Sequence, residues 1–356
     1  MKVIENQVVE QAVAGIEGLD QGMVEAVSAK VDQLTKPLGA LGKLEKMVIR
    51  LGGIQRTDSP SIDKRAVTVM CGDHGVVDEG VSAYPVELTA LMMGNFSREG
   101  AAINVLSRYT GTDVHVIDVG SKLDELPPGI VDAKVKAGTD NMAKGPAMSR
   151  EEALKAIEVG IRKAQDLAAK GYKSISLGDM GIGNTTPSAA IIAVITGKTV
   201  SEITGIGTGI TEEKRMEKAR IIEKSIQVNG LDGDWRSSYD AVDVLARVGG
   251  LELAALAGIC IGGAASRMAV VVDGVIAGAS ALIAYEMNNT VGEYIFASHQ
   301  SVEPAHVASL EYMGLEAPLR LDMRLGEGTG AVLLYPLLEA SLKIYNEMAT
   351  FADLGL

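Results

Sequence analysis

Apolar runs that stop at glycine recur along the chain and predict strands. Residues 65–71, 114–120, 174–178 and 269–274 are rich in aliphatic side chains, and each run ends at or beside a glycine. A short run of this kind is typical of a strand that is buried on both faces of a sheet. We therefore predict four such strands.

Segments with a helical period lie between these runs and at both ends of the chain. They cover residues 8–51, 151–170, 214–227 and 333–351, and Pro37 is expected to break or start a helix within the first. Strands that alternate with helices predict an α/β fold with a mostly parallel sheet and helices on both faces. The helical segments at the two chain ends are expected to pack together as a small domain.

Composition and charge exclude several classes of protein. Of 356 residues, 47% are hydrophobic and only 4% are aromatic, which indicates a compact core of small aliphatic side chains. The net charge is −13, and no block is rich in lysine or arginine. These features argue against nucleic acid or an anionic membrane as a partner.

The cysteines and the apolar segments predict a cytoplasmic location. Cys71 and Cys260 lie far apart in apolar surroundings, which is typical of reduced thiols in a reducing compartment. Acidic residues interrupt the N-terminus where a signal peptide would be apolar. Residues 260–284 are apolar but are broken by Arg267 and Asp273, so we expect a buried strand and helix there, not a membrane span.

Four aspartates fall at the ends of the predicted strands: Asp73, Asp118, Asp179 and Asp273. Ligands of parallel sheets bind beyond these carboxyl ends. The carboxylates around Asp73 and Asp118 leave a metal-dependent phosphohydrolase as an alternative. However, the chain has four histidines and lacks both an H-E-x-x-H helix and a G-x-S-x-G elbow, so we expect no metal and no other cofactor.

A glycine-rich loop, residues 181–186, separates a predicted strand from an alanine-rich helix. Such a loop directs free N–H groups and the positive end of a helix dipole at an anion, which favours a phosphate site over a packing turn. A second glycine-rich segment, residues 205–209, could form another wall. Lys218 follows on a predicted helix and could reach a phosphate; the alternative is a solvated helical lysine.

Glu327 lies between Gly326 and Gly328 in a third glycine-rich segment. Glycine on both sides removes Cβ atoms that would keep a ligand away and permits backbone angles closed to other residues. One alternative is a surface turn with a solvated glutamate. The other glycine-rich segments at strand ends favour a ligand-facing carboxylate.

Together these motifs resemble those of the nicotinate-nucleotide:dimethylbenzimidazole phosphoribosyltransferases. The resemblance is collinear from about residue 34 to the C-terminus and rests on residues 37–45, 72–76, 81–85, 180–186, 248–250, 273–274, 298–303 and 324–331. It implies transfer of phosphoribose from nicotinate mononucleotide to the nitrogen of a cobamide lower-ligand base, giving an α-riboside 5′-phosphate and nicotinate. It also implies a Rossmann-like catalytic domain at residues 61–331, a small helical domain from residues 1–60 and 332–356, and a homodimer or a heterodimer with a paralogue.

The resemblance also implies a role for each matching residue. Glu327 would be the catalytic base, with Asp179 as a second carboxylate of the site. The phosphate and ribose would be held by Gly181, Gly183, Asn184, Thr185, Gly207, Lys218 and Ser301, and the acceptor base by Ser82, Tyr84, Leu91 and Leu325.

The chain departs from the family's usual pattern at three positions. Asp179 stands where glutamate is usual, Leu91 where glutamine is usual, and Glu99 where glycine is usual. Leu91 makes the base pocket more apolar and favours a phenolic acceptor, as in relatives that work as complexes of two paralogous subunits. A non-catalytic paralogue that stabilises an active partner is an alternative, although the retained Glu327 and Lys218 argue against it.

Overall fold

The computed structural model describes residues 4–206 and 211–356, and within these residues six strands form one sheet. The strand order is β3-β2-β1-β4-β5-β6, and every neighbouring pair is parallel. The predicted α/β fold is therefore confirmed. The strands are β1 (Arg65–Gly72), β2 (Asp113–Gly120), β3 (Val131–Asp132), β4 (Ser174–Met180), β5 (Ala269–Val272) and β6 (Ile295–Ala297).

The four strands predicted from the sequence are β1, β2, β4 and β5. Every residue of β1 and of β5 is buried, because helices cover both faces of the sheet there. The sequence did not predict β3 and β6. They are two and three residues long, which is too short for a hydrophobic period to be recognised.

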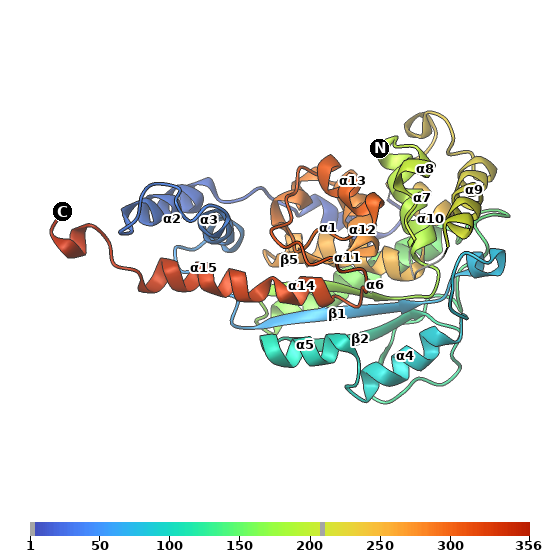
Figure 1. Cartoon of the computed structure of the whole chain (residues 1–356), viewed down its shortest axis with the longest axis horizontal. Coiled ribbons are helices and arrows are strands. Elements are labelled where there is room, and N and C mark those ends of the chain that lie inside the picture. Colours follow the sequence, from blue (N-terminus) through green and yellow to red (C-terminus); the bar gives the residue numbers. More distant parts are fainter. Residues whose placement is uncertain (1–3, 207–210) are drawn as a thin grey trace.

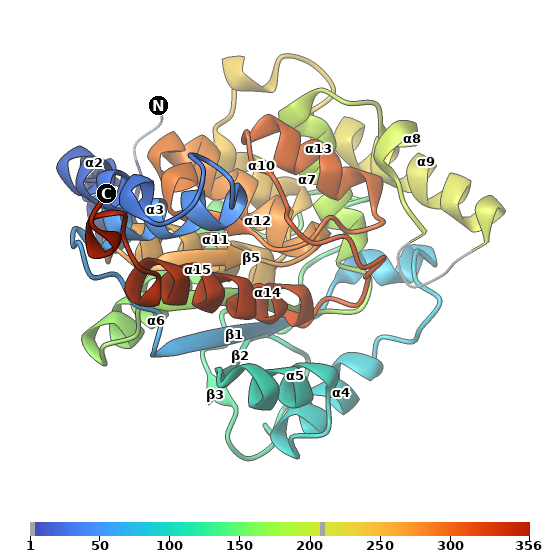
Figure 2. The ribbon, with the colours of Figure 1, turned by 60° about the vertical axis from the view of Figure 1, so that its left-hand side comes forward.

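Helices cover both faces of the sheet (Figures 1 and 2). On one face, α11 contacts β1, β2, β4 and β5 and packs against α6. On the other face, α4, α5 and α14 contact the strands. These helices are α4 (Leu88–Ser97), α5 (Ala102–Thr110), α6 (Arg150–Ala169), α11 (Leu251–Ala265) and α14 (Thr329–Leu333).

A second group of helices surrounds α7 and α12 beside the sheet. Among the described residues, no helix is both long enough and apolar enough to cross a membrane. The group consists of α7 (Thr185–Thr196), α8 (Val200–Ile203), α9 (Glu212–Val228), α10 (Ala241–Val248), α12 (Val275–Met287) and α13 (Pro304–Tyr312). Short 3-10 helices are η1 (Gly75–Glu79), η2 (Trp235–Ser237), η3 (Asn289–Tyr294) and η4 (Ala352–Leu354).

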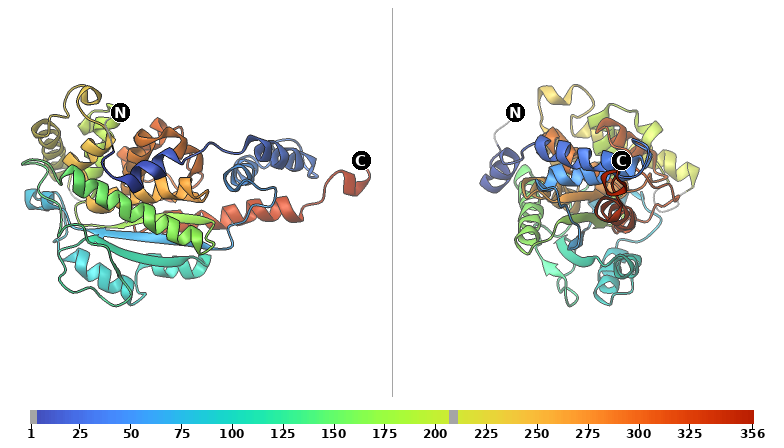
Figure 3. Two further views of the ribbon diagram at one scale, coloured as in Figure 1. Left: turned by 180° about the vertical axis from the view of Figure 1, so that it is seen from behind. Right: turned by 90° about the vertical axis from the view of Figure 1, so that its left-hand side faces the viewer.

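The two ends of the chain meet in a helical unit that projects from the body (Figures 1 and 3). It contains α2 (Gln21–Gln33), α3 (Lys43–Gln55) and α15 (Tyr335–Glu347), and α15 packs against α3. Leu34 and Thr350 form an antiparallel bridge. By contrast, α1 (Gln7–Ala14) contacts α6 and α11 of the body. The division into two domains stays a prediction, and α1 would fall to the larger one.

Candidate active site

A pocket lies beyond the carboxyl ends of β4 and β5, where parallel sheets bind ligands. It has an empty volume of about 820 Å³, part of which is open to solvent. The loops after β4, β5 and β6 and the loop that leads into α14 form most of its wall. The lining residues are Val81, Ser82, Asp179, Met180, Gly181, Ile182, Gly183, Asn184, Thr185, Gly274, Val275, Ile276, His299, Ser301, Glu303, Arg324, Leu325, Gly326 and Thr329.

The loop between β4 and α7 forms one wall of the pocket. Gly183 has a φ of +89°, a left-handed conformation that favours glycine. The N–H of Ile182 donates to Thr89 Oγ1 at 3.1 Å, so a side chain of α4 holds the middle of the loop. Thr185 begins α7, as predicted, and the helix N-terminus therefore opens onto the pocket. This geometry suits an anion.

Lys218 reaches this wall from α9. Its side chain is 1% exposed, and Nζ donates to Thr185 Oγ1 at 2.6 Å. The alternative of a solvated helical lysine is therefore wrong. Burial lowers the pKa of Lys218 to about 8, while the negative charge of Glu303 acts in the opposite direction. A bound phosphate would supply a second negative charge and stabilise the ammonium form.

Glu327 is buried in a strained turn. Gly326, Glu327 and Gly328 have φ values of +88°, +62° and +88°, so three consecutive residues are in the left-handed region. A non-glycine residue in this conformation is uncommon, and such strain concentrates at functional sites. Glu327 is 3% exposed, and its Oε2 accepts a hydrogen bond from the N–H of Ile103 at 3.2 Å. Burial raises the pKa of Glu327, and the alternative of a solvated surface turn is wrong.

Asp179 and Asp273 add two further buried carboxyl groups. Asp179 lies near the end of β4, and its Oδ2 accepts from Asn184 Nδ2 at 2.9 Å. Burial, followed by the charge of Asp273, raises the pKa of Asp179 to about 8. Burial also raises the pKa of Asp273 to about 7, although it accepts hydrogen bonds from the N–H groups of Gly328 and Ala331. Near neutral pH these carboxyl groups are therefore partly protonated, and a cationic ligand group at this end of the pocket would stabilise their ionised forms.

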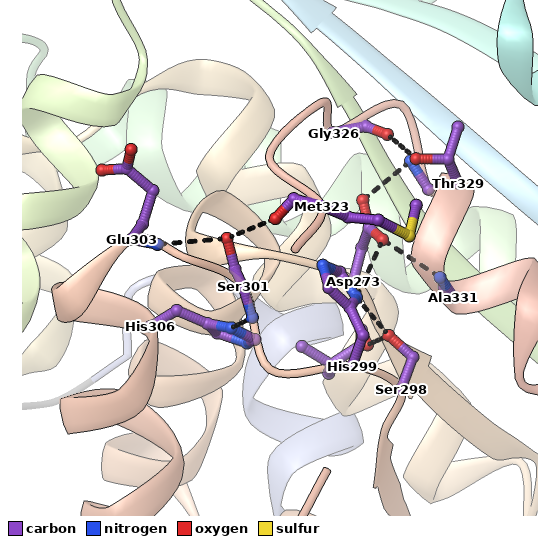
Figure 4. A network of polar contacts seen from close by, with 12 residues as sticks. Asp273, Ser298, His299, Ser301, Glu303, His306, Met323, Gly326, Thr329 and Ala331 are labelled. Atoms are coloured by element: carbon purple, nitrogen blue, oxygen red, sulfur yellow. Dashed lines mark hydrogen bonds and ion pairs between the residues drawn. The ribbon is translucent and has the colours of Figure 1, made fainter. Parts of the chain in front are cut away.

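The segment after β6 contributes Ser298, His299, Ser301 and Glu303 to a polar network that also includes Asp273 (Figure 4). Ser301 Oγ donates to the carbonyl of Met323 at 3.2 Å, and the N–H of Ser301 donates to His306 Nδ1 at 3.1 Å. The N–H of Glu303 makes a longer contact of 3.4 Å with Ser301 Oγ. Ser301 is thus held on three sides next to the pocket.

The structure brings most of the predicted site residues together. Glu327 directly follows Gly326, which lines the pocket. Lys218 contacts the pocket wall through its hydrogen bond to Thr185. Tyr84 and Leu91 are 50% and 66% exposed and lie outside the lining set. Gly207 lies outside the described residues. The predicted residues that line the pocket are Ser82, Asp179, Gly181, Gly183, Asn184, Thr185, Ser301 and Leu325.

Several lining residues had no predicted role in the site. His299 and Glu303 lie in residues 298–303, a segment that carries the family resemblance, but the resemblance implied a role there only for Ser301. Their burial, at 2% and 5% exposure, is a property of the fold. Glu99, for which the sequence offered no explanation, has a φ of +58°, which accounts for the glycine that is usual in the family at this position.

The cysteines and the carboxylates give no sign of a metal centre in the part of the chain that the structure describes. Cys71 and Cys260 are free and buried, as predicted. Within residues 4–206 and 211–356, no group of three or more histidine, cysteine, aspartate or glutamate side chains is arranged to hold a metal ion. Asp73 and Asp118, which supported the metal alternative, instead accept hydrogen bonds from nearby backbone N–H groups. The absence of a metal stays a prediction.

Comparison with known proteins agrees with this geometry. A phosphoribosyltransferase family model matches residues 16–356. The nicotinate-nucleotide–dimethylbenzimidazole phosphoribosyltransferase of Geotalea uraniireducens (strain Rf4) is 52% identical over 347 residues, which cover 97% of each chain. That of Desulforamulus reducens is 49% identical with the same coverage. The crystal structure of CobT from Thermus thermophilus is 42% identical, has a TM-score of 0.88, and covers 94% of this chain and 99% of its own.

The fold and the pocket therefore define a phosphoribosyltransferase, and the chain is an enzyme of this class. It belongs to the family of the nicotinate-nucleotide–dimethylbenzimidazole phosphoribosyltransferases.

Proposed function

We propose that this enzyme transfers phosphoribose from nicotinate mononucleotide to a cobamide lower-ligand base, either dimethylbenzimidazole or a phenolic compound. The observation that supports this proposal is that one end of the pocket suits an anion and the other suits a cation. Lys218 and the N-terminus of α7 suit the phosphate of the donor, whereas Asp179 and Glu327 suit its pyridinium. The names of the relatives support nicotinate nucleotide as the donor and dimethylbenzimidazole as the acceptor. The phenolic alternative rests on Leu91.

The transfer needs one base and no acid. The acceptor nitrogen, or a phenol oxygen, attacks C1′ while the C1′–N bond breaks, and the bonding electrons return to the pyridine ring of nicotinate. Because the leaving nitrogen carries a positive charge in the donor, it departs without a proton. Attack from the opposite face inverts the β-linkage to the α-riboside. Glu327 takes the proton that the acceptor loses, and burial helps by raising its pKa toward that of the acceptor.

The acceptor is expected to bind at the mouth of the pocket. Ser82 and Leu325 line this region, and Leu325 is 59% exposed. Tyr84 and Leu91 are also exposed and would complete an apolar wall only after a rearrangement or in a dimer. A homodimer, or a heterodimer with a paralogue, would cover these side chains and remains part of the proposal. The cytoplasmic location stays a prediction.

Purified chain, incubated alone with nicotinate mononucleotide and one acceptor at a time, tests the proposal. Dimethylbenzimidazole, adenine, phenol and p-cresol are compared by nicotinate release and by the mass of the riboside phosphate. We expect product with dimethylbenzimidazole or a phenol, and undiminished rates in the presence of a chelator. No nicotinate release with any acceptor would favour the non-catalytic paralogue, whereas chelator-sensitive phosphate release would favour a phosphohydrolase.

A further inference from the structure

His299 occupies the wall between the two charged ends of the pocket. It lies two residues before Ser301 in the segment after β6, and Figure 4 shows its ring beside Asp273 on one side and Ser301 on the other. His299 lines the pocket and is 2% exposed. Its backbone forms a bridge with Leu319, and the N–H of Gln300 donates to the Leu319 carbonyl at 2.9 Å, so the main chain here is fixed.

The hydrogen bonds of Ser298 determine which nitrogen of His299 carries the proton. Ser298 Oγ lies 2.7 Å from the carbonyl of Val272, which can only accept, so the hydroxyl proton is directed there. Ser298 Oγ also lies 3.0 Å from His299 Nδ1 and must accept at this contact. Nδ1 therefore carries a proton, which also faces Asp273 Oδ1 at 3.8 Å. In the neutral ring Nε2 is then an acceptor.

Glycine at position 330 leaves room for this arrangement. A Cβ atom on Gly330 would lie 2.1 Å from His299 Nδ1 and 2.8 Å from Asp273 Oδ1. The last glycine of the segment 326–330 is thus explained by the space that the imidazole needs. Burial lowers the pKa of His299 to about 4, so the ring is neutral at physiological pH.

We infer that His299 contacts the ribose of the nucleotide and accepts a hydrogen bond from a ribose hydroxyl through Nε2. This inference rests on the proposed function. In nicotinate mononucleotide, the ribose joins the phosphate to the pyridinium. His299 likewise lies between Asp273, at the carboxylate end, and Ser301. Ser301 leads to the cationic end, because the N–H of Glu303 contacts Ser301 Oγ and the charge of Glu303 acts on Lys218. A neutral acceptor with a fixed tautomer distinguishes a ribose from a deoxyribose at this point, because only the former supplies the proton.

Steady-state kinetics with nicotinate mononucleotide and its 2′-deoxy and 3′-deoxy forms test the inference. For the wild type we expect kcat/KM to fall about 10-fold with one of the two deoxy donors, the usual scale for one lost hydrogen bond. His299→Ala and His299→Asn should lose this discrimination. For these variants, the ratio of kcat/KM with nicotinate mononucleotide to kcat/KM with the same deoxy donor should approach one. His299→Gln is the matched control, because its amide oxygen reaches the former position of Nε2 and should restore part of the ratio.

Direct binding measurements repeat the comparison without turnover. The three ligands are ribose 5-phosphate, 2-deoxyribose 5-phosphate and 3-deoxyribose 5-phosphate. The inference would be overturned if wild type and His299→Ala preferred ribose 5-phosphate over its deoxy forms by the same factor. Circular dichroism is used to check that both proteins are folded. A wild type that discriminates between the sugars but releases no nicotinate would instead contradict the proposed function and leave the ribose contact standing. A protein that binds all three equally would refute the contact.

Discussion

The pocket has two regions that differ in how firmly the chain holds them. The polar floor consists of Asp179 and Ser301, which line the pocket, and of Lys218 and Glu327, which adjoin its lining. All four are buried and hydrogen-bonded to neighbours. The proposed apolar rim consists of Leu325, which lines the pocket, and of Tyr84 and Leu91, which lie outside the lining. All three side chains are at least half exposed.

This difference separates chemistry from acceptor choice. Leaving a buried polar side chain without its partner costs about 1–3 kcal/mol in desolvation, so substitutions in the floor that remove a hydrogen-bond partner are costly. An exposed apolar side chain can be replaced with an effect on stability that is usually within about ±0.5 kcal/mol. We therefore expect the floor to govern turnover and donor binding, and the rim to govern which base is accepted. The following predictions test this comparison, beginning with the largest expected effect.

Glu327→Gln should lower kcat by about 10²-fold or more while the protein stays folded, the scale expected of a positioned base. The amide keeps the shape of the side chain and can still accept from the N–H of Ile103, but it cannot take a proton. Nicotinate release at saturating substrate measures the effect. Glu151→Gln, at a 78% exposed glutamate, is the control. A Glu327→Gln rate above half of the wild-type rate would remove Glu327 from the mechanism.

Lys218→Ala should raise the KM for nicotinate mononucleotide about 10- to 150-fold with a smaller change in kcat, because a phosphate contact far from C1′ stabilises ground and transition states alike. The pKa near 8 also predicts a wild-type KM that rises as the pH passes above 8 and the ammonium is lost.

Lys224→Ala, on the exposed side of the same helix, should leave KM unchanged. An unchanged KM in Lys218→Ala together with a collapsed kcat would assign Lys218 to the chemical step. A wild-type KM that is flat between about pH 7 and 9 would argue against titration of Lys218 near its pKa of about 8.

Asp179→Asn should raise the melting temperature of the free enzyme at pH 8 relative to wild type, by several degrees, and much less at pH 5. The pKa of Asp179 in the folded state, about 8, is above its value of 3.8 in the unfolded chain. The folded state therefore binds the extra proton between these values, and wild-type stability falls as the pH rises through them. Asparagine cannot ionise, so the variant avoids this loss.

Thermal unfolding of wild type and Asp179→Asn at pH 5 and pH 8 isolates the contribution of Asp179. All other ionisable groups are present in both proteins, so their effects cancel in the difference. A difference in melting temperature that is the same at both pH values would contradict the raised pKa of Asp179 and its coupling to Asp273.

Leu91→Gln should change the preference between phenol and dimethylbenzimidazole only a few-fold in the isolated chain. Leu91 is 66% exposed, so water can satisfy a polar ring nitrogen of the acceptor, and the full penalty for an unpaired buried group does not apply. Competition between the two acceptors, with the product masses compared, measures the ratio. A shift of more than about 20-fold, within the range for an unpaired buried group, would show that the rim is covered during the reaction, as a second subunit or a closing of the rim would do.

The sequence by itself determined the four longest of the six strands in the described sheet and the neighbourhood of the site. Continuous apolar runs revealed β1 and β5 because both faces of these strands are buried, and the glycine before and after Glu327 indicated a special backbone that the three positive φ values confirm. The glycine loop after β4 was also predicted to open a helix, and Thr185 begins α7. All of these features depend on neighbours within a few residues along the chain.

Only the tertiary structure decided the burial and pairing of side chains that lie far apart in the sequence. Lys218 could have been solvated until the contact with Thr185, 33 residues away, placed it inside. Asp273 and His299 come into contact where the loops after β5 and β6 meet the start of α14. Gly330 lies beside both side chains at this point. Desolvation and hydrogen bonding depend on such distant neighbours, and they set both the pKa of Asp179 and the tautomer of His299.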